Sequence, residues 1–317
     1  MKIVFMGTPA FACPPLEAVH NSRHEISLVV TGPDKQSGRG RKVLSTDVAV
    51  LANKLGLPTS KPKSLKDESL FEEIKALNPD LIVVIAFRIL PKKLFSLPKY
   101  GSINIHGSLL PKYRGAAPIN WALINGESET GLSAFYLKQQ VDTGDVIGQV
   151  KVKIEETDNF DSLYARMSAA SAPFLIEMLD AIEKGNAKAI EQDESLVSQA
   201  PKITPFDALI DFGFPAKNVV NFVRGLSTKP GAYTNYKDKK IKILACDKSD
   251  EAGDGNTRPG TIIRNRKKLL VQCANSAIEI KQVIPEGKKV MDGVSFLNGF
   301  KPEIGDLFGD MSEESLK

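Results

Sequence analysis

The sequence predicts an α/β fold with a mostly parallel sheet and flanking helices, followed by a small C-terminal β-barrel. In the first half, apolar strand signals alternate with helical stretches, which is the pattern of βαβ units. In the last third, five short strand candidates follow one another with polar turns between them, which is typical of a small barrel. A length of 317 residues also favours two domains, because it is more than one core usually serves.

The elements of the first half are predicted from apolar runs and helical periodicity. The strands are 2–7, 25–31, 80–87 and 102–107, and the helices between them are Cys13–His20, Thr46–Leu55 and 70–77. This pattern is Rossmann-like, but the turn GTPAFA lacks G-x-G-x-x-G and no acidic residue follows as a ribose partner, so a nicotinamide enzyme is not predicted. Ligands in such sheets bind at the carboxyl ends of strands, so a ligand site is expected near Phe87 and His106, which lie at two such ends.

The second half begins with a long helix, roughly Phe160 to Lys184, and a polar stretch with two prolines that predicts a linker. A short helix at 215–226 precedes the strand candidates 232–236, 240–246, 260–265, 268–273 and 277–283. The expected division is a catalytic domain at residues 1–189, a linker at 190–205 and a C-terminal domain at 206–317.

The composition indicates a soluble globular protein and gives no sign of a membrane span. The 42% hydrophobic and 25% charged content is that of a soluble globular protein, and no apolar run approaches the roughly 20 residues that span a bilayer. The N-terminus turns polar too soon for a signal peptide, so a cytoplasmic location is expected. Cys13, Cys246 and Cys273 lie far apart without a C-x-x-C, so neither a disulfide framework nor a metal site is predicted.

The stretch from Gly101 to Trp121 carries the main functional signal. Asn104 and His106 are two residues apart on a strand, so their side chains point to the same face. The turn VDTGD places Asp142 where it could return to the histidine, and an acid, a histidine and an amide suffice for acyl transfer to an amine. The alternative is that His106 caps a strand and Asp142 a turn. After Gly107, a short run could offer backbone groups and an apolar wall to a flat ligand: Ser108, Leu109, Leu110 and Pro111.

Two basic regions indicate a polyanionic partner. Lys217 to Lys301 holds 17 Lys and Arg against 8 Asp and Glu, and the last sixteen residues hold five acids and one lysine. Such a basic barrel fits an RNA backbone, although a charge run alone is often a solvated face. The loop GRGRK carries Arg39, Arg41 and Lys42 on glycines, and arginine binds phosphate in a bidentate manner.

Several motifs identify the chain more closely, and they cover nearly its whole length: KIVFMGTPAFA, SGRGRK, NIHGSLLPKYRGAAPIN, ETGLSAF, VDTGDVI, QDESLVSQAPKI and RGLSTKPGAYT. On these motifs the chain resembles the folate-dependent formyltransferases. The resemblance implies transfer of a formyl group from the co-substrate 10-formyltetrahydrofolate to the α-amino group of methionine esterified to initiator tRNA, as translation initiation requires. It also implies an OB-like, tRNA-binding C-terminal domain and no obligatory protein partner.

The resemblance also assigns roles to single residues. Asn104 and His106 would donate to the oxyanion, and Asp142 would orient His106 and move protons. Arg39 matches the arginine of a loop that enters the tRNA acceptor stem, with Arg41 and Lys42 beside it. No metal is implied.

The pterin would lie against residues 108–111 and the turn at Ala86 to Arg88, which includes Phe87. Relatives often read A-Y-G there with an additional residue before I-L-P, whereas this chain reads AFRILP. Phe11 is a candidate wall of the methionine pocket. Tyr113, Arg114 and Trp121 could shape the site or only pack. A formyltransferase for an amino sugar nucleotide and a noncatalytic RNA-binding module are the competing hypotheses.

Overall fold

The computed structural model describes residues 1–37, 42–253 and 256–309. The chain forms two compact units. The first comprises Met1–Pro118, Glu129–Lys153 and Tyr164–Ala200, and the second comprises Ile119–Ser128, Ile154–Leu163 and Pro201–Lys317. The stretch 190–205, expected to be a linker, is thus divided after Ala200, because residues up to that point pack with the first unit.

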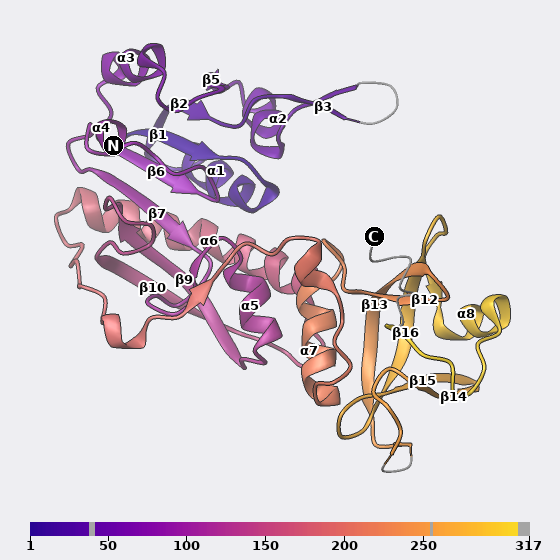
Figure 1. Cartoon of the computed structure of the whole chain (residues 1–317). Helices are drawn as coiled ribbons and strands as arrows, with labels where there is room; N and C mark the ends of the chain where they lie inside the picture. The colour runs from indigo at the N-terminus through magenta and orange to yellow at the C-terminus, as the bar shows by residue number, and fades with distance from the viewer. Residues whose placement is uncertain (38–41, 254–255, 310–317) are drawn as a thin grey trace. The chain divides into compact units, whose positions relative to one another are not determined.

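The first unit contains a seven-stranded sheet in the order β10-β9-β7-β6-β1-β2-β5 (Figure 1). Its strands are β1 (Lys2–Gly7), β2 (Glu25–Val30), β5 (Thr59–Ser60), β6 (Leu81–Ile85), β7 (Ser102–His106), β9 (Glu129–Tyr136) and β10 (Val146–Lys153). The five strands from β5 to β7 are parallel, whereas β9 and β10 are antiparallel additions. The predicted Rossmann-like sheet is therefore confirmed.

Helices and short pairings complete this unit. The helices are α1 (Cys13–His20), α2 (Asp47–Lys54), α3 (Glu68–Leu77), α4 (Lys92–Phe95) and α6 (Phe160–Glu183), whose first turn belongs to the second unit. The short elements are η1 (Ala10–Ala12), β3 (Lys35–Ser37), β4 (Lys42–Leu44), β8 (Arg114–Gly115), η2 (Glu194–Leu196) and β11 (Gln199–Ala200). None of the helices in the described part of the chain is long and apolar enough to span a membrane.

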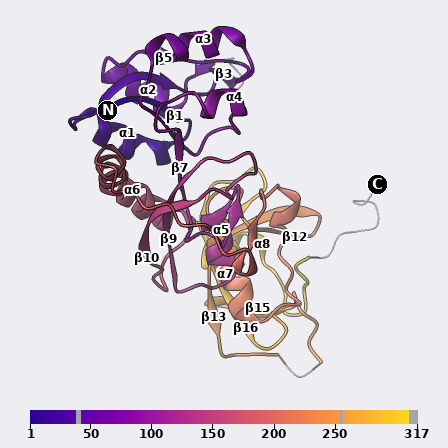
Figure 2. The same ribbon diagram turned by 90° about the vertical axis from the view of Figure 1, so that its left-hand side faces the viewer.

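The strands alternate their side chains between two covered faces. One face forms a buried cluster with α3 and α4, made of Val4, Met6, Leu28, Val30, Leu70, Ile74, Ile82, Val84, Leu90 and Leu94. Ile3 and Phe5 are fully buried and point to the opposite face by the two-residue period of a strand, where Figure 2 shows α1 and α6. Coverage of both faces explains why DLIVVIAF lacks polar alternation.

The second unit is built on an antiparallel sheet in the order β12-β13-β16-β15-β14, with β17 beside β16. Its elements are α5 (Pro118–Ile124, of which Pro118 belongs to the first unit), η3 (Phe206–Ala208), α7 (Ala216–Leu226), β12 (Tyr233–Tyr236), β13 (Lys239–Ser249), β14 (Ile262–Arg266), β15 (Lys268–Gln272), β16 (Ala277–Pro285), β17 (Met291–Asp292) and α8 (Gly293–Phe300). All five strands predicted for this region are present.

The segment 305–309 joins the two edges of this sheet. Gly305 and Asp306 exchange backbone hydrogen bonds with Ile262 of β14, and the Gly309 N–H donates to the Asn235 carbonyl of β12. The Tyr236 hydroxyl also donates to the Asp306 carboxylate at 2.6 Å. The sheet is therefore closed by an irregular segment rather than by direct pairing of β12 with β14, which agrees with the predicted OB-like barrel.

Substitution of Phe296 tests the core of the second unit. Its ring is fully buried and stacks on Phe300 at 4.5 Å between centroids, with Tyr236 at 6.0 Å. Phe296→Ala should lower the free energy of unfolding by about 3–5 kcal/mol because it leaves a cavity. Urea unfolding followed by the fluorescence of Trp121, the one tryptophan of the chain and part of this unit, measures the loss.

The matched control is Phe206→Ala, since the Phe206 side chain belongs to the same unit but is 89% exposed. It should change the free energy of unfolding by less than about 0.5 kcal/mol. Equal losses for the two variants would contradict the assigned core.

Candidate active site

Strand β7 presents the predicted polar pair at the carboxyl edge of the parallel sheet. Asn104 lies opposite Val84 of β6 and Phe135 of β9, and His106 lies opposite Ser133 of β9. His106 is only 6% exposed, and the Asn104 carboxamide oxygen is buried without a hydrogen-bond partner among the described residues. A buried amide oxygen without a partner is costly unless a ligand donates to it. Asn104 is therefore available to a bound substrate.

The hydrogen bonds of His106 determine which ring nitrogen can act. Its Nε2 lies 2.8 Å from the Tyr113 carbonyl oxygen, which only accepts, so Nε2 carries a proton. Its Nδ1 faces the Asp142 carboxylate at 3.8 Å, which is longer than a hydrogen bond. Nδ1 is thus the nitrogen left to exchange a proton with a ligand, and it donates only when the ring is protonated.

The loop after β9 returns Asp142 to the histidine, as the sequence predicted. Asp142 is 7% exposed, adopts a left-handed backbone conformation with φ of 57°, and accepts a hydrogen bond from the Gly115 N–H at 2.8 Å. Gly144 is required in this turn because a Cβ there would lie 1.6 Å from the Tyr136 carbonyl oxygen. The three predicted catalytic residues therefore come together at one end of β7 and in the adjacent loop.

The Ser108–Pro111 segment forms a rigid turn against β9. Ser133 Oγ donates to the Ser108 carbonyl and accepts from the Leu110 N–H, and the Gln149 amide donates to the Leu110 carbonyl. Several of the backbone groups expected to face a ligand are therefore used within the protein. The segment still offers an apolar surface, since Leu109 is only partly buried, and folate binding by Ser108, Leu109, Leu110 and Pro111 stays a prediction.

The turn after β6 is closed by Arg88. Its guanidinium donates to the carbonyls of Pro62 and Lys63 at 3.0 and 3.1 Å and lies 5.0 Å from the centre of the Phe87 ring. Burial lowers the pKa of this arginine. Nη1 and Nη2 thus each have one carbonyl partner, while Nε is buried without a partner among the described residues. Contact of Phe87 and Arg88 with the pterin stays a prediction.

Of the loop that contains GRGRK, the structure describes the residues up to 37 and from 42 onward. Arg39 and Arg41 lie outside the described residues, and so does the side chain of Lys42, whose backbone opens β4. The strands β3 and β4 pair as a hairpin. Close to it, Lys61 forms an ion pair with Asp34 at 2.7 Å.

A glutamine that the sequence analysis assigned to the linker belongs to this site. Gln192 is 7% exposed, and its side-chain amide donates to the carbonyls of Asp142 and Gly144. Arg114, 6% exposed, donates to the Gln192 carbonyl oxygen and to the Glu194 carboxylate. The run QDES has no apolar periodicity that would predict a buried side chain. Only its presence in the family motif QDESLVSQAPKI could have indicated that Gln192 belongs to the site.

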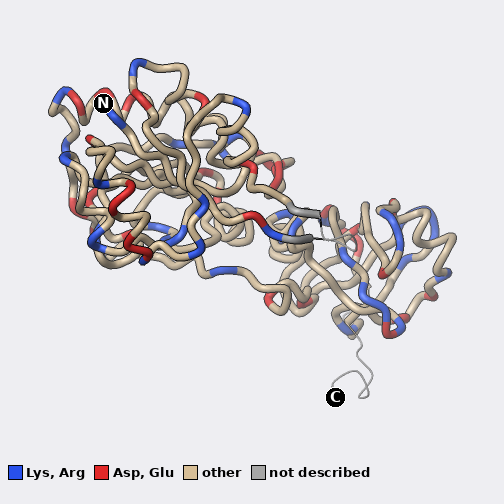
Figure 3. The backbone as a smooth tube through the Cα atoms, turned by 90° about the horizontal axis from the view of Figure 1, so that it is seen from above, with Lys and Arg blue, Asp and Glu red and all other residues tan. Residues whose placement is uncertain are grey.

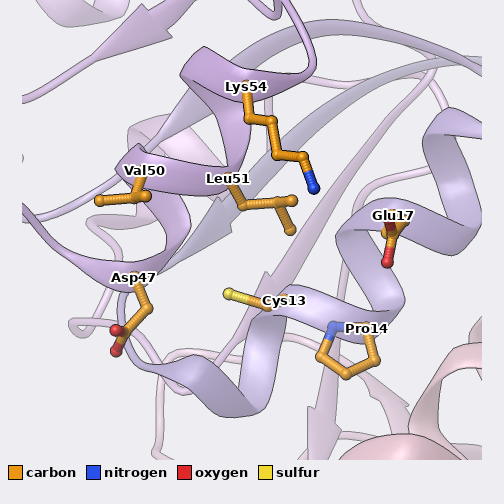
Figure 4. A pocket seen from close by; sticks show the side chains of 7 residues that line it. All are labelled: Cys13, Pro14, Glu17, Asp47, Val50, Leu51 and Lys54. Carbon is orange, nitrogen blue, oxygen red and sulfur yellow. The ribbon is translucent and has the colours of Figure 1, made fainter.

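A separate cavity of about 370 Å³ lies between α1 and α2 (Figure 4). Its lining residues are Cys13, Pro14, Glu17, Asp47, Val50, Leu51 and Lys54, so the cavity is separate from Asn104, His106 and Asp142. Burial, with Asp47 and Glu17 adding to it, raises the pKa of the Cys13 thiol to about 11, so the thiol stays protonated near neutral pH. Phe11 nearby is 5% exposed and packs edge-on against Tyr164 at 5.2 Å.

Comparison with known families shows the class of protein to which the chain belongs. The formyl transferase family matches residues 1–179, and the formyl transferase C-terminal domain matches residues 202–301. Among solved structures, HypX from Aquifex aeolicus in complex with tetrahydrofolic acid has a TM-score of 0.61 at 17% identity, covering 99% of this chain and 51% of that one. The N-formyltransferase from Helicobacter canadensis has a TM-score of 0.64 at 16% identity, covering 88% and 98%. These two share the fold.

Curated relatives are closer in sequence. The methionyl-tRNA formyltransferase of Citrifermentans bemidjiense is 42% identical over 311 residues, which cover 98% of this chain and 96% of the relative. That of Bacillus velezensis is 39% identical over 317 residues, covering 99% of each. The chain therefore belongs to the formyl transferase family and, within it, to the methionyl-tRNA formyltransferases.

Proposed function

We propose that this enzyme transfers the formyl group of 10-formyltetrahydrofolate to the α-amino group of methionyl-tRNA, with Asn104, His106 and Asp142 as its catalytic residues. The observation that carries the proposal is their convergence at the carboxyl end of β7, where neither the Asn104 side-chain amide nor His106 Nδ1 is hydrogen-bonded to another described residue, so that the Asn104 amide nitrogen and His106 Nδ1 are left to donate to a substrate. The names of the relatives support methionyl-tRNA as the acceptor, and a solved structure of the same fold in complex with tetrahydrofolic acid supports a folate as the donor. Methionyl-tRNA is used in translation, so we place the enzyme in the cytoplasm.

The chemistry needs donors more than a strong base. The nucleophile is an α-amino group, whose pKa of about 7.7–8.0 leaves neutral amine near neutral pH. Its nitrogen attacks the formyl carbon, and the carbonyl electrons move to oxygen to give a tetrahedral intermediate. The Asn104 amide and protonated His106 Nδ1 stabilise that oxyanion. The proton lost by the attacking nitrogen is passed on to the folate nitrogen. The oxyanion electrons then re-form the carbonyl as the bond between the formyl carbon and the folate nitrogen breaks.

Asp142 supports both the stabilisation of the oxyanion and the transfer of the proton. Its Oδ2 is held by the Gly115 N–H and lies 3.8 Å from His106 Nδ1, so its negative charge is next to the imidazole. The same carboxylate can take the proton from the attacking amine, directly or through water. The fixed Nε2–Tyr113 bond prevents the ring from turning away during the transfer.

The second unit supplies the charge that we propose for tRNA binding. Lys239, Lys267 and Lys289 are exposed and form no ion pair with a carboxylate among the described residues. Figure 3 shows Lys and Arg spread over this unit, with fewer acidic residues among them. We propose residues 206–317 as the tRNA-binding domain, residues 1–189 as the catalytic domain, and Arg39, Arg41 and Lys42 as contacts to the acceptor end.

Removal of one donor tests the catalytic assignment. Asn104→Ala and His106→Ala should each lower kcat by about 10²–10³-fold, since one oxyanion donor contributes about 2.7–4 kcal/mol to the barrier. Transfer of radiolabelled formyl to methionyl-tRNA measures kcat, and a parallel assay with a 4-amino sugar nucleotide should show no turnover. A His106→Ala enzyme near wild-type turnover, or preference for the sugar, would sink the assignment.

Salt dependence tests the charge assignment. The Kd for tRNA should rise steeply with salt because each neutralised phosphate releases counterions, with a slope of about 0.7–0.9 per contact. The triple variant Lys239→Ala, Lys267→Ala, Lys289→Ala should reduce that slope by about 2 to 3. Its matched control is Lys75→Ala on α3, and the Kd for the folate should be nearly unchanged in both. An unaltered slope in the triple variant would remove these lysines from the interface.

A further inference from the structure

The loop that carries Asp142 is held from outside by one side chain. Two of its backbone carbonyls, those of Asp142 and Gly144, accept hydrogen bonds of 2.9 and 2.7 Å from the Gln192 amide nitrogen. The left-handed conformation of Asp142 is unfavourable for a residue with a Cβ, so the loop needs outside contacts to keep it. Gln192 supplies two of them although it lies 50 residues further along the chain.

The orientation of the Gln192 amide is fixed by Arg114. The Gln192 carbonyl oxygen accepts from Arg114 Nε at 3.0 Å and from Nη2 at 2.8 Å. A flipped amide would set its NH₂ against the guanidinium and its oxygen against two carbonyls, so only one orientation satisfies all four bonds. On its other edge Arg114 is paired with the Glu194 carboxylate at 2.7 and 3.1 Å, which compensates the buried charge.

Arg114 also lies between the two residues that bind the catalytic pair. The carbonyl of the preceding Tyr113 accepts from His106 Nε2, and the N–H of the following Gly115 donates to Asp142 Oδ2. The Tyr113 N–H is itself bound by Ser198 Oγ, in the segment that contains Gln192. Backbone and side chain of three consecutive residues thus connect the histidine, the aspartate and the glutamine in one closed set of hydrogen bonds.

We infer that Gln192, oriented by Arg114, is a positioning residue that sets the place of Asp142 relative to His106. The inference rests on the proposed function, because it assumes that Asp142 and His106 are catalytic. Asp142 Oδ2 lies 3.8 Å from His106 Nδ1, so a small shift of the loop decides whether the two atoms come within hydrogen-bond distance. Gln192 touches no reacting atom and acts through the Asp142 backbone.

The test compares Gln192→Ala and Gln192→Glu in the full-length enzyme. Gln192→Glu keeps an oxygen that can accept from Arg114, but it loses the N–H groups that donate to the carbonyls of Asp142 and Gly144. Each variant should lower kcat by about 10–100-fold, the size of effect expected from a misplacement of about 1 Å. KM for methionyl-tRNA and Kd for the folate should stay within about twofold. If Gln192→Ala does not fold, Gln192→Glu decides the question alone.

The matched control is Gln199→Ala, which removes an exposed glutamine from the same segment and should leave kcat unchanged. A second readout is the double variant with Asp142→Ala. If Gln192 acts through Asp142, Gln192→Ala should lower kcat by less than about twofold in that background, because residues that act as a unit are non-additive. A merely structural role would cost the same in both backgrounds.

The two proposals fail in different ways. If Asp142→Ala keeps wild-type turnover, the catalytic assignment is wrong. If Asp142→Ala is impaired but Gln192→Ala and Gln192→Glu retain kcat within about twofold, or lose as much in the Asp142→Ala background as alone, only the positioning role is overturned.

Discussion

The burial of two ionisable side chains at the carboxyl end of β7 is the constraint on which the surrounding structure depends. His106 and Asp142 are 6% and 7% exposed, and buried polar groups must be hydrogen-bonded. Tyr113 and Gly115 meet this need with one carbonyl and one N–H, which requires the chain to turn sharply after the strand. Tyr113 adopts φ of 61° and Gly115 φ of 126°, so the turn is built from residues in the left-handed region. The positions of His106 and Asp142 and the path of residues 107–115 are consequences of the same requirement.

The antiparallel strands β9 and β10 support this turn from the side opposite the parallel strands. Ser133 of β9 and Gln149 of β10 satisfy the backbone of residues 108–110, and Gly131 permits close approach, since a Cβ there would lie 2.5 Å from Leu109 Cδ2. The change from parallel to antiparallel pairing beside β7 therefore has a local reason. It places the polar side chains of Ser133 and Gln149 next to the backbone of residues 108–110.

The sequence predicted the parts of the fold that depend on local pattern. Apolar runs located the parallel strands and the barrel strands, and the spacing of Asn104 and His106 predicted their common face. Gln192 was assigned to a linker because its partners lie 50 and 78 residues away and leave no periodicity in QDES. The closing segment at 305–309 was missed for the same reason, since irregular backbone that bonds to Ile262 and Asn235 has no strand signal. The contacts of Arg88 could not be predicted from the sequence either. The run AFRILP is one residue shorter than in many relatives, and this difference does not indicate that the guanidinium binds the carbonyls of residues 62 and 63.

The state of the cysteines bears on the type of acyl transfer. A covalent route would need an activated nucleophile on the protein, and a thiolate is the most reactive candidate. Burial raises the pKa of Cys13 to about 11 and that of Cys273 to about 12, and it raises the pKa of Cys246 as well. All three thiols are therefore protonated near neutral pH, and none belongs to the group around His106. The amine of the substrate is itself a competent nucleophile, so the protein needs only to hold the two substrates and stabilise the oxyanion. In the proposed mechanism, Asn104, His106 and Asp142 perform that task, and the formyl group is transferred directly without a formyl-enzyme.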